Sequence, residues 1–111
     1  MQSFITFEDF TKLDLRVGTI ISVSDFPEAR KPAYKIVIDF GFLGQKKSTA
    51  QITQLYRKED LIGKQVIAVV NFKPKQVANT ISECLILGFE NTNGVVLLNP
   101  EAQSVNGSVV K

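Results

Sequence analysis

The chain of 111 residues contains no histidine, no tryptophan and only one cysteine, Cys84. Without histidine, its serines and threonines lack the usual general base, so we predict no catalytic residues and no enzymatic activity. A single cysteine excludes an internal disulfide framework, which fits a reducing cytoplasm. A metal site would need histidines, several cysteines or clustered acids, so we expect neither a metal nor another cofactor. Cys84 lies in an apolar run and is most simply a small buried hydrophobe.

Long hydrophobic runs are also missing, so the sequence predicts no membrane insertion. Residues 1–12 have no basic start and no long apolar stretch, and we do not expect a secretory signal there. Apolar residues make up 44% of the chain and charged residues 22%. This composition is typical of a globular protein, and the length predicts one domain over residues 1–111. Because a single cysteine fits a reducing compartment, we expect the protein in the cytoplasm.

Acidic residues are scarce in two parts of the chain, although the net charge is only +2. Residues 30–58 contain seven basic residues against one acid, Asp39, and residues 63–82 contain three lysines and no acid. A compact fold can gather these two stretches on one face that favours a polyanion. Solvated surface charges are the alternative interpretation.

Short apolar segments of strand-like pattern are spread along the whole chain. We predict five strands, at residues 16–25, 34–40, 47–53, 65–72 and 84–90. A capped helix is expected over residues 6–12, and a helical turn over residues 58–62, before Gly63. The Asn91–Gly94 segment predicts a hairpin turn before residues 95–98. These elements indicate an all-β fold: a five-stranded OB-fold barrel with a short N-terminal helix, a helical turn between strands 3 and 4, and a C-terminal hairpin extension. Periodicity alone fits another small barrel equally well.

Residues 71–83 form a polar, basic connection between two apolar strands, an arrangement typical of a ligand-binding surface. Asn71 is expected either to form a turn or to contact a ligand. For Glu83 we favour a hydrogen-bonding clamp over a base-edge acceptor, because an unpaired buried carboxylate costs several kcal/mol. Phe72 and Phe89 could stack on bases, but packing in the core is the stronger expectation.

Four large apolar residues recur at every third position near the N-terminus: Phe4, Phe7, Phe10 and Leu13. Together with the apolar strand at residues 66–70, they exceed what a barrel of this size easily hides. We therefore predict a homodimer whose two-fold interface buries them.

Six segments of the chain resemble the tRNA-binding OB-domain family: LDLRVGTI (13–20), FPEARKPAYKIVIDFG (26–41), STAQIT (48–53), GKQVIAVVNFKPKQVA (63–78), SECLILG (82–88) and VVLLNP (95–100). Within this family the chain looks most like the CsaA branch of secretion-associated chaperones. The resemblance covers residues 6 to about 107 and implies the OB fold and the dimer.

The resemblance also implies a ligand-binding face that comprises Lys35, Ser48, Gln51, Asn71, Lys73, Lys75, Ser82 and Glu83. The chain departs from the family at Lys75 and Gln76, where arginine is frequent, and at Asn79, where glycine is frequent. Lysine lacks the planar fork of arginine, and asparagine adopts a left-handed turn more readily than most residues.

Two functions are compatible with this resemblance. The first is a homodimeric CsaA-like chaperone that binds unfolded or export-bound polypeptide and also structured RNA such as tRNA. Exposed apolar groups would then contact the polypeptide, with Phe26, Tyr34, Phe42 and Ile81 as candidates. The alternative is a free-standing, structure-specific tRNA-binding protein without a chaperone role.

Overall fold

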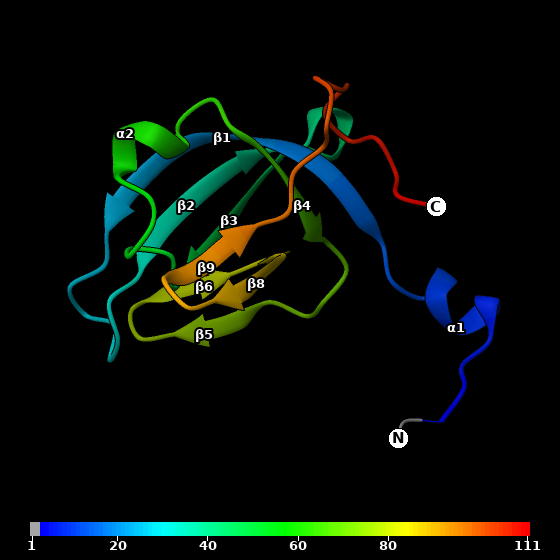
Figure 1. Cartoon of the computed structure of the whole chain (residues 1–111), viewed down its shortest axis with the longest axis horizontal. Coiled ribbons are helices and arrows are strands. Elements are labelled where there is room, and N and C mark those ends of the chain that lie inside the picture. The colour runs from blue at the N-terminus through cyan, green and yellow to red at the C-terminus, as the bar shows by residue number, and fades with distance from the viewer. Residues whose placement is uncertain (1–2) are drawn as a thin grey trace.

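An antiparallel sheet that curls into a barrel forms the centre of the computed structural model, which describes residues 3–111 (Figure 1). Its strands are β1 (Leu15–Asp25), β2 (Tyr34–Asp39), β3 (Gln45–Ala50), β4 (Gln65–Val69) and β7 (Leu85–Ile86). They are ordered β3-β2-β1-β4-β7. The long strand β1 pairs with β4 through its first residues and with β2 through its last. The predicted five-stranded OB-fold barrel is confirmed.

Short helices and two hairpins lie outside the barrel sheet. They are α1 (Phe7–Thr11), η1 (Gly41–Leu43), α2 (Lys58–Leu61) and two hairpins, β5 (Lys75–Val77) with β6 (Thr80–Ser82) and β8 (Gly88–Asn91) with β9 (Gly94–Leu97). The helical turn between the third and fourth barrel strands is present as α2, as predicted. The predicted hairpin turn is also confirmed, because Asn91 Oδ1 accepts the main-chain N–H groups of Asn93 at 2.8 Å and Gly94 at 3.1 Å. No helix within residues 3–111 is both long and apolar enough to cross a bilayer.

The core is built from alternate residues of the central strands, because successive side chains of a strand point to opposite faces. Ile36 and Ile38 of β2 point inward together with Phe40, and β4 contributes Val66 and Ala68. Gly18 lies on β1 where these side chains leave no space. A Cβ there would lie 2.6 Å from Ile38 Cγ2 and 2.7 Å from the Phe40 ring, so only glycine fits.

The C-terminal segment lies along the edge of β1 that β2 leaves uncovered. The N–H of Val17 donates to the carbonyl of Ser108 at 3.0 Å, and the N–H of Gly107 donates to the carbonyl of Val17 at 2.8 Å. The side chain of Gln65 adds two hydrogen bonds to the main chain of Ser104, at 2.7 and 2.9 Å. This pairing was not predicted from the sequence.

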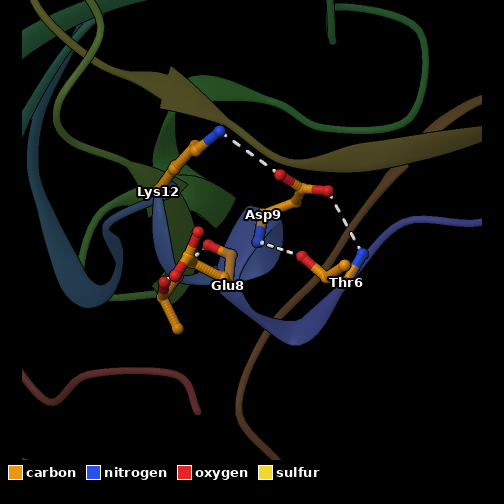
Figure 2. A network of polar contacts seen from close by, with 5 residues as sticks. Thr6, Glu8, Asp9 and Lys12 are labelled. Carbon is orange, nitrogen blue, oxygen red and sulfur yellow. Dashed lines mark hydrogen bonds and ion pairs between the residues drawn. The ribbon is translucent and has the colours of Figure 1, made fainter.

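Helix α1 forms a short arm that lies away from the barrel in Figure 1. Figure 2 shows its capping box: Asp9 N–H donates to Thr6 Oγ1, and Thr6 N–H donates to Asp9 Oδ2, both at 3.1 Å. The hydrogen bond from the Thr6 main chain and the nearby Lys12 ammonium hold the pKa of Asp9 below its usual value. The helix predicted over residues 6–12 is confirmed, with Thr6 as its N-cap.

The largest differences from the predicted strands occur at three places. Strand β3 ends at Ala50 rather than residue 53, because β2 begins at Tyr34, after a loop with two prolines, and has no residue to pair further. Strand β4 ends at Val69, where its pairing with Leu15 ends. The predicted strand 84–90 is divided, because its first part pairs with β4 and its second part with β9.

Several burial predictions were wrong. Phe72 is 51% exposed because it follows the end of β4, and Phe89 is 56% exposed because β8 lies outside the barrel sheet. Conversely, the apolar strand 66–70 contributes to the core of the single subunit and is largely unavailable to a partner. The connection 71–83 is not a plain loop but contains the β5–β6 hairpin. Its left-handed residue is Ala78, with φ of 48°, and not Asn79.

Candidate functional site

A groove of about 860 Å³ opens between four parts of the chain. The loop between β1 and β2 forms one wall with Arg30 and Lys31, and the turn of the β5–β6 hairpin forms another with Ala78. The floor contains Ile52 and Leu97. The groove therefore combines an apolar floor with a cationic wall.

A second, smaller pocket of about 470 Å³ lies at the base of the β5–β6 hairpin. We call it the hairpin pocket; it is lined by Phe72, Lys73, Lys75, Ser82, Glu83, Cys84 and Leu85. The hairpin contributes residues to both cavities, and Leu85 lines both. Movement of this hairpin would consequently change the shape of both cavities at once.

The structure brings together only part of the predicted ligand-binding face. Lys73, Lys75, Ser82 and Glu83 meet in the hairpin pocket, whereas Gln51 lines the groove. Lys35 lies on β2, where its ammonium is 5.5 Å from the centre of the Phe26 ring.

Ser48 does not face solvent. Its side chain is buried, with the residue 2% exposed, and its hydroxyl donates to the carbonyl of Cys84 at 2.9 Å. Ser82 donates to the same carbonyl at 3.3 Å. Cys84 is buried, as predicted, and burial raises the pKa of its thiol to about 11. The Ser48 contact joins β3 to the segment that follows β6.

Asn71 uses both ends of its side-chain amide within the protein. Its Oδ1 accepts the N–H of Asp14 at 2.9 Å, and its Nδ2 donates to the carbonyl of Lys12 at 2.8 Å. The residue fixes the connection between α1 and β1 to the end of β4. In this arrangement no polar atom of its side chain is turned toward the hairpin pocket.

Glu83 likewise contacts the main chain. Its Oε1 accepts the N–H of Lys47 at 2.9 Å, and its own N–H donates to the carbonyl of Lys47 at 2.7 Å. This geometry is the clamp that we favoured, although its partner is strand β3 rather than a loop.

No ion pair in the described part of the chain joins a cation of the two cavities to an acidic side chain. Within residues 3–111, ion pairs join Lys12 to Asp9, Arg16 to Asp14, Arg57 to Asp60 and Lys58 to Asp25. Arg30, Lys31, Lys73 and Lys75 belong to none of these pairs. Such free cations can neutralise phosphate groups or acidic side chains of a ligand.

Sequence reasoning did not single out Arg30 and Lys31 as part of a site. Both belong to the basic stretch 30–58, but that stretch alone does not show which of its cations line a cavity. The apolar residues expected to contact polypeptide were also expected to be exposed, and that expectation of exposure is wrong for Phe26 and Tyr34, which are buried, although Phe26 lines the groove. Phe42 is exposed but lies beneath the Arg16 guanidinium, 5.8 Å from its ring centre, while Ile81 is half-buried.

The model of a family described as "Putative tRNA binding domain" matches residues 15–109. The chain belongs to this tRNA-binding domain family. The matched span runs from the first residue of β1 into the C-terminal segment that covers β1, so the tRNA-binding domain comprises the whole barrel and both hairpins.

Two solved structures that resemble this tRNA-binding domain are described as CsaA chaperones. The one from Bacillus anthracis str. Ames has a TM-score of 0.93 and 51% sequence identity, and the match covers 98% of this chain and 100% of that one. The one from Picrophilus torridus has a TM-score of 0.93 and 54% identity, with 97% and 100% covered. The resemblance to the CsaA branch is confirmed at the level of sequence and fold.

Curated relatives of the tRNA-binding domain include much longer enzymes. The methionine–tRNA ligase of Nanoarchaeum equitans (strain Kin4-M) is 41% identical over 107 residues, which cover 96% of this chain but 14% of the ligase. The chain therefore spans about one seventh of that relative, and the similarity concerns the tRNA-binding domain region.

Proposed function

We propose that this chain acts in the cytoplasm as a homodimeric chaperone of the CsaA type. Its groove would hold extended polypeptide, and its cationic walls would also bind structured RNA such as tRNA. The observation that carries the proposal is the end-to-end match to two CsaA structures at 51% and 54% identity, with 100% of each of those chains covered. The ligases share only a small part of their length with this chain.

The groove suits an extended polypeptide because its floor is apolar and its rim offers hydrogen-bonding groups. Ile52 and Leu97 supply the apolar surface, and Thr49 and Gln51 supply polar atoms that can bond to a peptide main chain. Apolar contacts of this kind depend little on ionic strength.

Structured RNA would be held through its phosphates by Arg30, Lys31, Lys73 and Lys75. About four phosphate contacts make the logarithm of the affinity fall by about 0.7–0.9 per contact for each tenfold rise in salt. RNA binding by a tRNA-binding domain without chaperone action is the alternative function, and salt distinguishes the two activities.

The proposed dimer accounts for the exposed apolar arm. Phe4 is 94% exposed and Phe7 is 74% exposed, and Phe10 packs against Phe7 with ring centres 6.0 Å apart. Leu13 is exposed as well. A two-fold interface would bury these groups and place two cationic sites on one body, which strengthens binding to one large ligand.

The test compares a fluorescent unfolded polypeptide with tRNA at low and high salt. Replacing Lys73 and Lys75 by Glu should weaken tRNA binding at least about tenfold and change polypeptide binding little, since each lost contact removes one released counterion. Lys111→Glu serves as the charge control. Ala29→Trp should fill the groove and block polypeptide, with Ala102→Trp at an exposed position as its control.

Each outcome has a definite meaning. Binding of tRNA without any binding of unfolded polypeptide would establish the alternative function. If neither ligand binds above the control variants, both functions are excluded.

Replacing Phe7 and Phe10 by Ser should yield monomers in sedimentation and weaken tRNA binding; an unchanged dimer would place the interface elsewhere.

A further inference from the structure

The barrel has a seam between its two outermost strands. Strands β3 and β7 lie at opposite ends of the sheet order, and no strand pairing joins them within the part of the chain that the structure describes. An open edge of this kind leaves main-chain N–H and C=O groups without partners. Residues 83–84, between β6 and β7, fill part of the seam, since Glu83 bonds to Lys47 of β3.

Glu83 occupies this seam as a substitute for a paired strand. Its N–H donates to the carbonyl of Lys47 at 2.7 Å, as in a normal strand pair. The returning bond, 2.9 Å long, runs from the N–H of Lys47 to the Glu83 carboxylate instead of a main-chain carbonyl. Hydrogen bonds to a charged acceptor are stronger than those between neutral groups. A single residue thus satisfies both main-chain groups of Lys47.

The position of Glu83 connects this seam to the hairpin. Glu83 directly follows Ser82, the last residue of β6, and Ser82 pairs with Lys75 of β5. We propose that Glu83 is a positioning residue: its two bonds to Lys47 fix the β5–β6 hairpin in the orientation that binds ligand. The predicted effect on ligand affinity rests on the proposed function. The predicted effect on the contact between Glu83 and β3 does not.

If Glu83 acted on RNA directly, through its charge, its removal would change RNA affinity in the opposite direction from the loss of a positioning residue. A carboxylate beside Lys73 and Lys75 repels RNA phosphates, so on electrostatics alone its removal should strengthen RNA binding. Positioning instead depends on the reach of the side chain. Glu83→Gln keeps an oxygen at the same distance from the main chain and loses the charge, whereas Glu83→Asp keeps the charge and shortens the side chain by one methylene.

Cys84 supplies a reporter of the seam that needs no ligand. Its Sγ lies 3.8 Å from the carbonyl of Lys47, and its own carbonyl accepts the hydroxyls of Ser48 and Ser82. The residue is buried and is the only cysteine of the chain. A hairpin that swings away from β3 would expose its thiol to reagent.

The experiment measures alkylation of Cys84 by iodoacetamide and binding of tRNA in the wild type, Glu83→Asp and Glu83→Gln. We expect alkylation to be about tenfold faster in Glu83→Asp, the effect of losing one charge-assisted hydrogen bond, and about threefold faster or less in Glu83→Gln, which keeps the bond with a neutral acceptor. Binding of tRNA should weaken in Glu83→Asp, although its charge is unchanged, and should not weaken in Glu83→Gln. Glu101→Gln, at an exposed position, controls for loss of a charge.

Equal alkylation rates in all four proteins would overturn the proposal. So would stronger tRNA binding in Glu83→Gln together with unchanged binding in Glu83→Asp, because that pattern is electrostatic. If no protein binds tRNA, the proposed RNA-binding function fails, and the alkylation rates still decide whether Glu83 holds the seam. Exchange of the Lys47 amide hydrogen in each folded variant gives a second measurement of the same bond.

Discussion

The side-chain amide of Asn71 donates a hydrogen bond to the carbonyl of Lys12 at 2.8 Å, although 59 positions separate the two residues. The same side chain accepts the N–H of Asp14 at 2.9 Å. The C-terminal end of a helix has carbonyls without intrahelical partners, and Asn71 satisfies one of them. The direction in which α1 leaves the barrel therefore depends on a residue at the end of β4.

Asn71→Ala should loosen the arm while leaving the barrel folded. Loss of two hydrogen bonds at an exposed site is expected to lower the free energy of unfolding by about 1–2 kcal/mol. Exchange of the Asp14 amide hydrogen should become faster, as measured by NMR. Asn99→Ala, at an exposed position, is the control. An unchanged Asp14 exchange rate would show that Asn71 does not hold the connection.

Ser48→Ala should destabilise the fold without changing the affinity of folded protein for tRNA. The substitution removes one of two hydroxyl donors to the buried carbonyl of Cys84, which costs about 1–2 kcal/mol in the free energy of unfolding. Chemical denaturation measures the loss, and Ser24→Ala at an exposed position of β1 should change it by less than about 0.5 kcal/mol. Weaker tRNA binding with unchanged stability would show that Ser48 contacts the ligand, as the family resemblance implies.

Gly18→Ala should be costly because the new methyl group meets Ile38 and Phe40 at less than van der Waals distance. Overpacking of a core lowers the free energy of unfolding by about 1–3 kcal/mol, and we expect the upper part of that range. Gly63→Ala is a suitable comparison, since its Cβ would meet no atom within 4 Å and only its φ of 89° is unfavourable. That strain costs about 1 kcal/mol. Equal losses in denaturation would contradict the packing argument.

Alkaline pH should destabilise the protein through Cys84. The thiol pKa rises from 9.0 to about 11 on folding, because burial disfavours the thiolate. Above pH 9 the unfolded chain loses a proton that the folded chain keeps, so the free energy of unfolding falls as pH rises from 9 toward 11. The full difference is about 2–3 kcal/mol at 1.36 kcal/mol per pKa unit. Cys84→Ala should flatten this part of the pH profile; a profile identical to that of the wild type would contradict the assignment.

The barrel was predictable because its strands show alternating apolar residues within their own sequence. Ile36, Ile38 and Phe40 alternate with polar or half-buried neighbours, and Asn91–Gly94 encodes its turn locally. The boundaries failed where the partner strand decides, as at Ala50, which is the last residue with a β2 partner. Periodicity describes one strand at a time and cannot show where its neighbour ends.

The candidate site was only half predictable for a related reason. Lys73 and Lys75 are adjacent in sequence to the hairpin that positions them, and both line the hairpin pocket. Ser48 lies within a mostly polar strand and Asn71 lies just beyond an apolar one, and both positions are compatible with either surface contacts or internal hydrogen bonds. Their partners, Cys84 and Lys12, are distant in sequence, so only the folded chain shows that these side chains bond to the protein's own main chain.

Strand β1 precedes every other strand of the domain in the sequence, yet the outer hydrogen bonds of Val17 and Leu15 are made with residues 107–110. During translation, that edge stays uncovered until almost the entire domain has left the ribosome. The outer edge of β1 is consequently completed only when residues 107–110 are available to pair with it, so the strand that starts the barrel is among the last to be satisfied.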